Sequence, residues 1–326
     1  MKAIMQTEYG PPDKVLKLTD IQKPVPGDGE VLVKVHASCI NWANVTMSIG
    51  TPFAARMTSG GITRPKYTIP GGDIAGTVEA IGSNVTQFQP GDEVYGDLGD
   101  SGFRGYAEYV SAAEKNLAIK PVNLTFEEAA TVPQAAVVAL QGLRNKGNIQ
   151  PGKKVLINGS SGGIGTFAIQ IAKSYDTEVT GVCSTRNTDF VLSLGADYVI
   201  DYTKEDFTRS QKKYDLVIAT AGYRSIFEYK RALSPNGIYV SAGGAMKQVF
   251  QGMIGPLVSK IGSRKLTFLM HRPDQKDLTI MKELIEADTV KPVIDRSYPL
   301  EETADAFLYY AQGKTRGKVV ITMRDE

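Results

Sequence analysis

Two short stretches near the middle of the chain have residue types and spacing that suit binding of a phosphorylated ligand. The first is the turn Gly159-Ser160-Ser161-Gly162-Gly163-Ile164-Gly165, which follows the apolar stretch 153–158 and precedes a helical pattern over 166–174. A strand, a glycine turn and a helix in this order predict a dinucleotide-binding unit. Glycines let backbone N–H groups approach a pyrophosphate, and the helix start adds positive dipole charge. Ser160, Ser161, Gly162, Gly163 and Ile164 are therefore the first cofactor-binding candidates.

The second stretch indicates which dinucleotide binds. An NAD site places an acidic residue about 20 residues beyond the glycines, where it binds the ribose 2′-OH. This chain has Ser184-Thr185-Arg186 there, after the predicted strand 178–183. A hydroxyl and a guanidinium can together bind a 2′-phosphate. The sequence therefore favours NADPH over NADH, with Ser184 and Arg186 as ligands of the phosphate.

The same glycine turn fits a different kind of enzyme. Residues 159–163 also match G-x-S-x-G, the nucleophile elbow of α/β-hydrolases, with Ser161 as nucleophile. Asp215 and His271 follow in the chain order of a hydrolase triad. The doubled glycine, Gly165 and the turn 184–186 have no role in such an enzyme, so the serine hydrolase ranks below the dinucleotide site. A glycine-rich turn without any ligand is the other alternative.

The elements that position these residues follow from the patterns of the remaining chain. With 326 residues, 42% of them hydrophobic and 22% charged, the chain is long enough for two domains with separate cores. Short strands at 31–37 and 73–82, with a turn into a third strand over 89–96, predict a small β-barrel. An irregular loop is expected over 41–66, with a helix over 42–48. Helical patterns begin at Thr125, and predicted strands at 197–201, 215–219, 237–241 and 265–270 alternate with helices. This alternation predicts an α/β fold with a doubly wound parallel sheet, whose ligands bind at the carboxyl ends of the strands.

Two further glycine pairs fall at those strand ends. Ala221-Gly222 and Gly243-Gly244 follow the predicted strands 215–219 and 237–241. Glycines at these positions let a nicotinamide lie flat against the backbone, so Ala221, Gly222, Gly243 and Gly244 are cofactor-binding candidates. The alternative is that they only form turns.

Composition and charge exclude several other classes. The net charge is +2 and no lysine- or arginine-rich run is present, which argues against a nucleic-acid partner. No apolar run is long enough to span a bilayer, and the N-terminal residues lack the apolar core of a signal peptide. Cys39 and Cys183 lie in apolar strand patterns that fit a reducing compartment without disulfides. A cytoplasmic protein is therefore expected.

Taken together, the motifs resemble those of the medium-chain dehydrogenase/reductase superfamily over nearly the whole chain, and most closely its zinc-independent quinone oxidoreductases. The motifs that carry the resemblance are Gly71-Gly72-Asp73-Ile74-Ala75-Gly76-Thr77-Val78-Glu79-Ala80-Ile81-Gly82, Pro90-Gly91-Asp92-Glu93-Val94, the turn 158–165, Leu194-Gly195-Ala196-Asp197 and Gly317-Lys318-Val319-Val320. The resemblance implies a GroES-like catalytic domain at 1–122 and 289–326, beside a Rossmann domain at 123–288. It also implies a homodimer joined through Rossmann edge strands near residues 249–270.

The resemblance further assigns roles to single residues. Asn41 matches a family asparagine beside the nicotinamide, where its amide can orient a ribose or an acceptor carbonyl. Thr46 stands where many quinone oxidoreductases have a tyrosine that reaches the acceptor, and Thr131 is similar to a threonine near the nicotinamide amide. Tyr202 matches a tyrosine near the adenosine phosphate, and Lys318 can reach the cofactor. The alternatives are loop capping for Asn41 and a sheet-edge position for Tyr202.

The chemistry implied by the resemblance is a reduction without zinc. Zinc alcohol dehydrogenases, which resemble this chain at 37–44, have a cysteine ligand where Asn41 stands and a histidine ligand where Gly72 stands. Without a Lewis acid, electrophilic acceptors are favoured, so hydride is expected to pass from NADPH to a quinone or an α,β-unsaturated carbonyl. The alternative function is an NADPH-binding, non-catalytic protein comparable to the family's lens crystallins. Candidates for lining an apolar acceptor pocket are Trp42, Phe53, Met57, Tyr67 and Met253.

Overall fold

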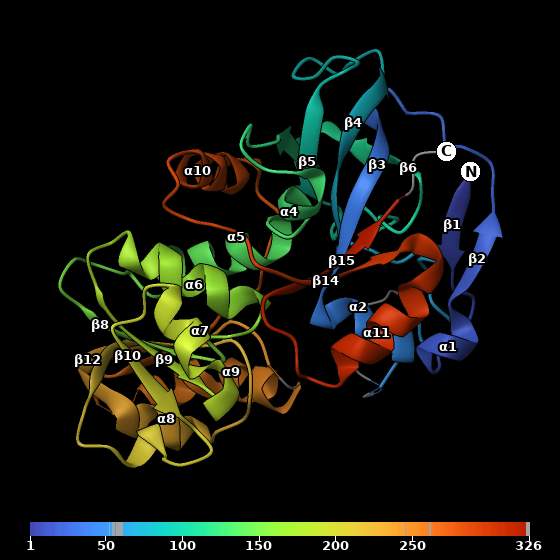
Figure 1. Cartoon of the computed structure of the whole chain (residues 1–326). Helices are drawn as coiled ribbons and strands as arrows, with labels where there is room; N and C mark the ends of the chain where they lie inside the picture. Colours follow the sequence, from blue (N-terminus) through green and yellow to red (C-terminus); the bar gives the residue numbers. More distant parts are fainter. Residues whose placement is uncertain (52, 54–55, 57–60, 245, 261, 324–326) are drawn as a thin grey trace. The chain divides into compact units, whose positions relative to one another are not determined.

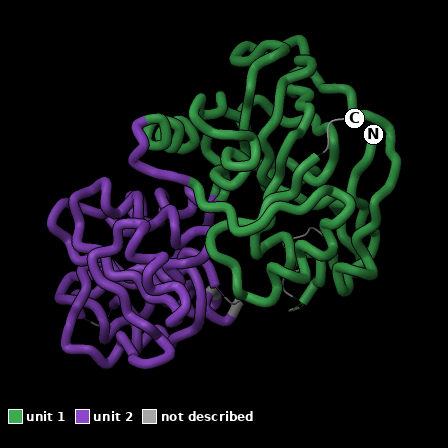
Figure 2. The backbone as a smooth tube through the Cα atoms, in the orientation of Figure 1, with its two compact units in different colours: residues 1–134, 272–286, 292–326 green, residues 135–271, 287–291 purple. Residues whose placement is uncertain are grey.

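The computed structural model of the chain has two compact units (Figures 1 and 2). It describes residues 1–51, 53, 56, 61–244, 246–260 and 262–323. Unit 1 comprises residues 1–134, 272–286 and 292–326, and unit 2 comprises residues 135–271 and 287–291. Met57, one of the expected pocket residues, lies outside the described residues.

Unit 1 is built around a seven-stranded sheet in which β3 is central. The sheet order is β14-β15-β3-β4-β5-β7, and β6 also pairs with β3. Its strands are β3 (Glu30–Ile40), β4 (Asp73–Ile81), β5 (Glu93–Asp97), β6 (Tyr109–Ala113), β7 (Leu117–Ile119), β14 (Ile294–Pro299) and β15 (Lys318–Thr322). β15 pairs antiparallel with β3, so the C-terminal segment completes the N-terminal sheet as expected. A separate pair is formed by β1 (Lys2–Met5) and β2 (Lys17–Asp20).

The helices of unit 1 bring distant parts of the chain onto this sheet. They are α1 (Pro12–Val15), α2 (Trp42–Ile49), η1 (Glu114–Asn116), α4 (Phe126–Ala130), α10 (Gln275–Glu286), η5 (Leu300–Glu302) and α11 (Thr303–Ala311). The helix expected over 42–48 is therefore present as α2. Val45 of α2 and Phe307 of α11 are buried in the same apolar cluster as Val33 and Ile74 of the sheet.

The expected domain limits at 122 and 289 do not coincide with the limits of the compact units. Residues 123–134 belong to unit 1, because the ring of Phe126 in α4 stacks on His36 of β3 with centroids 4.3 Å apart. Residues 272–286 also belong to unit 1, because the hydroxyl of Tyr95 in β5 donates to the carbonyl of Leu278 in α10 at 2.6 Å. The change from strand to helix pattern near Thr125 thus marks a helix of unit 1, not a domain limit.

Unit 2 is a parallel six-stranded sheet with helices between its strands (Figure 1, green to orange). Its strands are β8 (Lys154–Asn158), β9 (Glu178–Cys183), β10 (Tyr198–Asp201), β11 (Tyr214–Ala219), β12 (Leu233–Ser241) and β13 (Lys265–Phe268). Its helices are α5 (Pro133–Gln141, from Ala135 onward), the π-helix η2 (Gly142–Lys146), α6 (Gly163–Lys173), η3 (Thr185–Asn187), α7 (Thr188–Ser193), η4 (Phe207–Arg209), α8 (Ile226–Ala232) and α9 (Met246–Ser259). The strand order β10-β9-β8-β11-β12-β13 is the 3-2-1-4-5-6 order of a Rossmann fold, with its switch point between β8 and β11.

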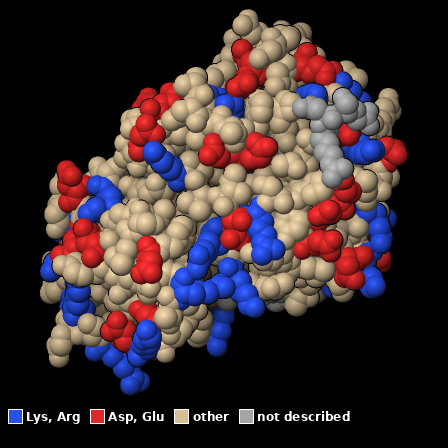
Figure 3. Space-filling model, in the orientation of Figure 1, with Lys and Arg blue, Asp and Glu red and all other residues tan. Residues whose placement is uncertain are grey.

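Two further observations concern the helices of the described residues and the charge of the surface. None of the helices among the described residues is long and apolar enough to cross a membrane. On the face shown in Figure 3, acidic and basic side chains are both distributed over the surface, in keeping with the net charge of +2.

Candidate functional site

The glycine turn lies at the start of α6, at the switch point of the parallel sheet. Gly162 is the N-cap residue of α6 and no side chain caps this end of the helix. The backbone N–H groups of Gly163, Ile164 and Gly165 are in the first turn, where a helix provides no internal acceptor. These N–H groups and the helix dipole form a site for an anion such as a pyrophosphate.

Two glycines of this turn are needed for different reasons. A Cβ built on Gly165 would lie 2.2 Å from the carbonyl oxygen of Gly159, so only glycine fits where α6 approaches the turn. A Cβ on Gly162 would meet only the Gly159 oxygen at 3.6 Å, which is ordinary contact, and φ at Gly162 is −84°. The protein itself therefore does not require glycine at position 162. A ligand that approaches the backbone there would require it.

This difference gives a paired prediction. Gly165→Ala is expected to lower the free energy of unfolding by about 1–3 kcal/mol or more, because the new methyl group overlaps backbone. Gly162→Ala is expected to leave stability within about 0.5 kcal/mol but to weaken binding of the dinucleotide about tenfold, which is about 1.4 kcal/mol. Urea denaturation and calorimetric titration with NADPH measure the two effects. Unchanged affinity in a stable Gly162→Ala variant would place the pyrophosphate elsewhere.

The serines of the turn connect it to the end of the neighbouring strand β9. Ser160 is fully buried, and its hydroxyl donates to the carbonyl of Val182 at 3.0 Å. Ser161 is half-buried, and its Oγ accepts a hydrogen bond from Nδ2 of Asn187 in η3 at 2.9 Å. Ser160 thus has a structural bond, whereas Ser161 keeps its own hydroxyl hydrogen available for a ligand. Sequence reasoning missed Asn187, since a residue in a 3-10 turn has no recognisable pattern.

The residues expected to select the cofactor lie together at the carboxyl ends of β9 and β10. Cys183 and Asp201 are register partners in these two strands, so the residues that follow each strand are neighbours. Ser184 is half-buried and Arg186 is exposed, and Tyr202 is 54% exposed. The backbone N–H of Tyr202 donates to the Cys183 carbonyl at 3.0 Å. A hydroxyl, a guanidinium and an aromatic ring thus occur at one edge of the sheet.

Asp201 was not expected from the sequence, and it holds these two strand ends together. Its carboxylate accepts hydrogen bonds from the hydroxyl of Thr185 and from the backbone N–H (3.0 Å) and hydroxyl (2.7 Å) of Thr203. Nζ of Lys204 lies 3.4 Å from the same carboxylate. The bond from Thr185, followed by those from Thr203, lowers the pKa of Asp201 to about 2, so Asp201 is ionised at neutral pH. The position of an acidic residue at the carboxyl end of a predicted strand is the sequence feature that could have indicated Asp201.

The backbone conformation and close neighbouring atoms explain why glycines follow β11 and β12. Gly222 and Gly244 have φ values of 74° and 97°, which favour glycine. A Cβ on Gly243 would lie 2.8 Å from the carbonyl oxygen of Thr220 and 3.4 Å from Cδ1 of Ile164. Ala221 is held beside the end of β8, because Nδ2 of Asn158, the last residue of that strand, donates to the Ala221 carbonyl at 3.0 Å. These residues and Ile164 therefore gather at one edge of the sheet, the edge expected for the cofactor.

The geometry contradicts the serine hydrolase hypothesis. Ser161 follows the carboxyl end of β8, whereas Asp215 is the second residue of β11, which runs parallel to β8. Asp215 therefore lies at the opposite edge of the sheet, about 13 Å away at roughly 3.3 Å per residue. Its carboxylate already accepts hydrogen bonds from the N–H of Lys154 at 3.0 Å and the hydroxyl of Ser234 at 2.8 Å. A triad needs direct hydrogen bonds between its members, which this arrangement does not allow.

In unit 1, Asn41 belongs to a buried polar cluster. Its Nδ2 donates to Oδ2 of Asp73 at 2.9 Å, and its Oδ1 accepts a hydrogen bond from Nζ of Lys318. Lys318 is 2% exposed and also donates to the carbonyl of Ile40 at 3.2 Å. This location favours a structural role for Lys318 over the cofactor contact expected from the sequence. The amide of Asn41 joins two buried charges that are far apart in the chain.

The two threonines expected near the acceptor (Thr46) and near the nicotinamide amide (Thr131) both bond to the backbone of their own helices. The hydroxyl of Thr46 lies 3.0 Å from the carbonyl oxygen of Trp42 and 3.1 Å from that of Ala43, both in α2. The hydroxyl of Thr131, which is buried, donates to the carbonyl of Glu128 at 2.6 Å and ends α4. Each hydroxyl hydrogen is thus used locally, which leaves only lone pairs for a ligand.

Asp73 is the central charge of the polar cluster. It also accepts hydrogen bonds from Sγ of Cys39 at 3.1 Å and from the backbone N–H of Gln134 at 3.2 Å. Burial, and then repulsion by Asp97, raise the pKa of Asp73 to about 6, although Lys318 opposes the rise. Burial likewise raises the pKa of the Cys39 thiol well above its usual range.

The cluster does not suit a zinc ion. A neutral thiol is a poor zinc ligand, and the lysine ammonium adds positive charge where a cation would have to bind. Within the part of the chain that the structure describes, no group of three or more His, Cys, Asp or Glu side chains is placed to hold a metal.

Comparison with known proteins identifies both halves of the chain. Residues 27–142 match the alcohol dehydrogenase GroES-like domain, and residues 194–321 match a domain described as zinc-binding dehydrogenase. The chain is 36% identical over 332 residues to a 2-methylene-furan-3-one reductase of Solanum lycopersicum, covering 98% of this chain and 79% of the relative. It is 33% identical over 338 residues to an NADPH-dependent alkenal/one oxidoreductase, chloroplastic, of Arabidopsis thaliana, with the same shares covered.

A solved structure agrees with these relatives. The quinone oxidoreductase from Coxiella burnetii superposes with a TM-score of 0.89 at 32% identity, covering 99% of each chain. The GroES-like match, the Rossmann strand order and the full-length relatives agree with one another. The chain belongs to the medium-chain dehydrogenase/reductase superfamily and, within it, to the quinone oxidoreductase-like members.

Proposed function

We propose that the protein is a zinc-independent oxidoreductase that transfers hydride from NADPH to a quinone or to an α,β-unsaturated carbonyl. The observation that carries the proposal is the uncapped start of α6 at the Rossmann switch point, with Ser184, Arg186 and Tyr202 at the neighbouring strand ends. The relatives named above, a furanone reductase, an alkenal/one oxidoreductase and a quinone oxidoreductase, support this reaction class.

In this proposal, three features of unit 2 hold the cofactor. The N–H groups of Gly163 and Ile164 bind the pyrophosphate, and the guanidinium of Arg186 pairs with the 2′-phosphate. Tyr202 packs on the adenosine half. When bound, NADPH supplies the hydride, and the protein contributes binding, orientation and exclusion of water.

The absence of zinc chemistry is supported by the side chains themselves. Asn41 and Gly72 stand at the positions of two zinc ligands in the zinc alcohol dehydrogenases that the chain resembles, and neither is a good zinc ligand. Lys318 bonds to Asn41 in the buried cluster. Acceptors that are already electrophilic do not require a Lewis acid, which fits quinones, enals and enones.

A homodimer is part of the proposal. Helix α9 exposes Phe250, Met253, Ile254 and Leu257 at the i, i+3, i+4 and i+7 spacing of one helix face, and it packs beside the edge strand β13. An exposed apolar stripe of this kind is typical of an interaction surface. The cytoplasmic location expected from the sequence stays a prediction, and the Arabidopsis relative carries a chloroplastic name.

One observation favours the non-catalytic alternative. The hydroxyl of Thr46 bonds within α2, so it supplies no proton donor where the family tyrosine would reach the acceptor. A protein that binds NADPH without turnover would retain the α6 site and lack an acceptor that oxidises the cofactor.

A steady-state screen separates these functions. With NADPH, the protein is expected to reduce at least one of 1,4-benzoquinone, trans-2-hexenal and 2-cyclohexen-1-one, and to leave hexanal unreduced, because saturated aldehydes need stronger activation. Loss of absorbance at 340 nm measures the rate. A chelator is expected to leave the rate unchanged. Binding of NADPH without oxidation by any acceptor would instead indicate the non-catalytic function, and inhibition by the chelator would contradict zinc independence.

A further inference from the structure

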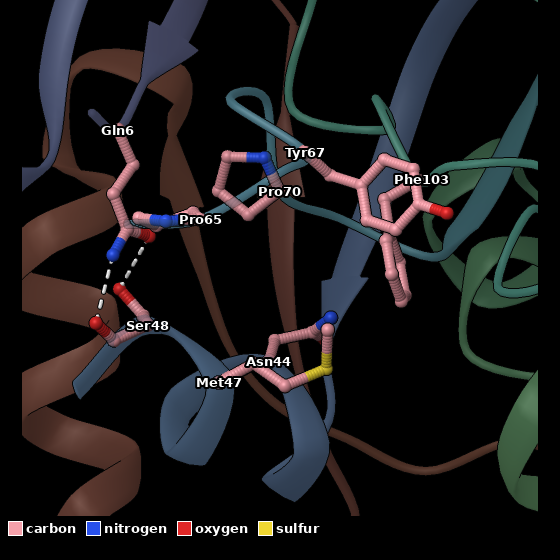
Figure 4. Close-up of a pocket in the computed structure, with 8 residues that line it drawn as sticks. All are labelled: Gln6, Asn44, Met47, Ser48, Pro65, Tyr67, Pro70 and Phe103. Atoms are coloured by element: carbon pink, nitrogen blue, oxygen red, sulfur yellow. Dashed lines mark hydrogen bonds between the residues drawn. The ribbon is translucent and has the colours of Figure 1, made fainter. Parts of the chain in front are cut away.

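A small pocket in unit 1 combines an apolar wall with a few polar groups (Figure 4). The space between its lining residues amounts to about 320 Å³ when the open solvent at its mouth is counted, so the pocket is shallow and open. The apolar lining consists of Met47, Pro65, Tyr67, Pro70 and Phe103, and the polar lining of Gln6, Asn44 and Ser48. The rings of Tyr67 and Phe103 pack edge to face with centroids 5.6 Å apart. Of the apolar residues expected to bind an acceptor, Tyr67 lines this pocket.

Two of the three polar residues are bonded to each other. The hydroxyl of Ser48 donates to Oε1 of Gln6 at 2.8 Å, and Nε2 of Gln6 donates to the carbonyls of Ser48 and Glu8 at 2.7 and 2.8 Å. These bonds, drawn in part in Figure 4, leave Gln6 no donor for a ligand. They also fix this side of the pocket to the start of the chain.

Asn44 differs because the NH₂ group of its amide has no partner among the residues that the structure describes. It is 5% exposed, and its Oδ1 accepts hydrogen bonds from the backbone N–H of Asn41 at 2.9 Å and the hydroxyl of Tyr106 at 3.4 Å. A backbone N–H can only donate, so the atom facing Asn41 must be the oxygen and the other must be the NH₂ group. Among the described residues, no acceptor bonds to this Nδ2. In Figure 4 it points into the space beside the end of the Met47 side chain, towards the aromatic rings.

Nδ2 of Asn44 is not among the fully buried polar atoms that lack a partner, so water or a ligand can reach it from the pocket and complete its hydrogen bond. The neighbouring walls are apolar and aromatic, and none of the lining residues within the described part of the chain is charged. The complementary ligand therefore has one hydrogen-bond acceptor attached to an apolar, preferably planar, body. An uncharged carbonyl on a ring or a conjugated chain has this chemistry, whereas a phosphate or a carboxylate lacks a cationic partner here.

We propose that this pocket binds the carbonyl end of the acceptor, with Nδ2 of Asn44 donating to the carbonyl oxygen and Met47 and Phe103 contacting its apolar body. The inference rests on the proposed function, for which it names the acceptor site within unit 1. Asn44 then takes part in substrate recognition through a donor that the bonds from Asn41 and Tyr106 hold in place. A donor at this oxygen favours acceptors whose carbonyl gains negative charge during reduction.

The test removes the donor, keeps the acceptor, and includes a control for the negative charge that the change adds. Asn44→Asp retains Oδ1 for Asn41 and Tyr106 and replaces the NH₂ group by oxygen, which when ionised cannot donate. Cyclohexanone, a ketone that lacks the alkene, serves as probe, and its binding is followed by saturation-transfer NMR at pH 9 without cofactor. We expect the dissociation constant of cyclohexanone to rise about tenfold or more, and that of methylenecyclohexane, which lacks the oxygen, to change little. Asn84→Asp makes the same charge change at an exposed site of unit 1 and is expected to have no effect.

A second variant covers the case in which Asn44→Asp does not fold. Met47→Phe fills the pocket, leaves Asn44 and its bonds in place, and is expected to abolish binding of both probes while NADPH binds with unchanged affinity. Failure of the wild type to bind cyclohexanone, or unchanged binding in either variant, would overturn the proposal. Failure of the proposed function is a separate outcome, since it would appear as cyclohexanone binding without NADPH oxidation by any acceptor.

Discussion

Arg186→Ala is expected to raise the dissociation constant for NADPH roughly 10- to 100-fold and to leave that for NADH nearly unchanged. A hydrogen bond between charged groups contributes about 1.5–3 kcal/mol, and only NADPH carries the 2′-phosphate that Arg186 would bind. Arg186 is exposed, so the loss of its side chain is expected to change the free energy of unfolding by less than about 0.5 kcal/mol. Calorimetric titration of both cofactors at low and moderate salt gives the comparison.

The controls lie in the same unit. Arg209→Ala removes another exposed guanidinium, which lies 3.7 Å from its neighbour Asp206, and is expected to leave both affinities unchanged. Ser184→Ala is expected to weaken NADPH binding less than Arg186→Ala, because a neutral hydroxyl contributes about 0.5–1.5 kcal/mol. Equal affinity of the wild type for NADPH and NADH would refute the assignment of Ser184 and Arg186.

Lys318→Met is expected to lower the free energy of unfolding by about 3 kcal/mol, the lower end of the 3–5 kcal/mol found when one partner of a buried ion pair is removed. The lower end applies because the amide of Asn41 stands between Lys318 and Asp73. Methionine keeps the apolar stem of the side chain but leaves Asp73 without a nearby positive charge. Urea denaturation measures the loss.

The loss is also expected to depend on pH. The pKa of Asp73 in the folded protein is raised to about 6, so the folded state binds more protons than the unfolded state between about pH 4 and 6. The contribution of Asp73 to stability is therefore greatest at low pH and falls as pH rises through this window. Without Lys318 the pKa of Asp73 rises further, so the variant is expected to lose more stability at pH 8 than at pH 5.

Two variants make this test specific to the buried cluster. Lys314→Met changes an exposed lysine close in sequence and is expected to alter stability by less than about 0.5 kcal/mol. Adding Asp73→Asn to Lys318→Met removes the uncompensated charge and is expected to recover part of the loss and most of its pH dependence. A loss in Lys318→Met that is equal at pH 5 and pH 8 would show that Asp73 does not depend on Lys318 for its charge.

The sequence predicted most of unit 2 correctly because its signals are local. The turn 159–165 has a strand on one side and a helix on the other within about 20 residues, and the alternation of strands and helices allows only a few sheet orders. The residues placed at the ends of β8 to β12 therefore gather at one edge, as expected. Asp201 was missed because its partners, Thr185 and Thr203, can be recognised only once β9 and β10 are paired.

In unit 1, local sequence patterns do not indicate which sheet a helix packs on or which distant side chains meet. Residues 123–134 and 272–286 fall in unit 1, whereas the limits expected from the sequence place them in the Rossmann domain. The limits differ because a helix pattern does not indicate which sheet the helix packs on. Asp73 and Lys318 lie in two of the motifs that carry the family resemblance, but neither motif shows that these side chains meet at Asn41. Their contact depends on β3, β4 and β15 being neighbours in one sheet.

The amino-acid sequence by itself thus determined the α/β class, the glycine turn at the start of a helix, and the candidate ligands of a 2′-phosphate, since each depends on residues close together in the chain. Only the tertiary structure decided that Lys318 is buried beside Asn41 and that one half of the Asn44 amide faces an apolar pocket. The physical reason is that the partners of a buried polar group are set by long-range packing, which brings together residues such as Asn41 and Lys318 that are 277 positions apart.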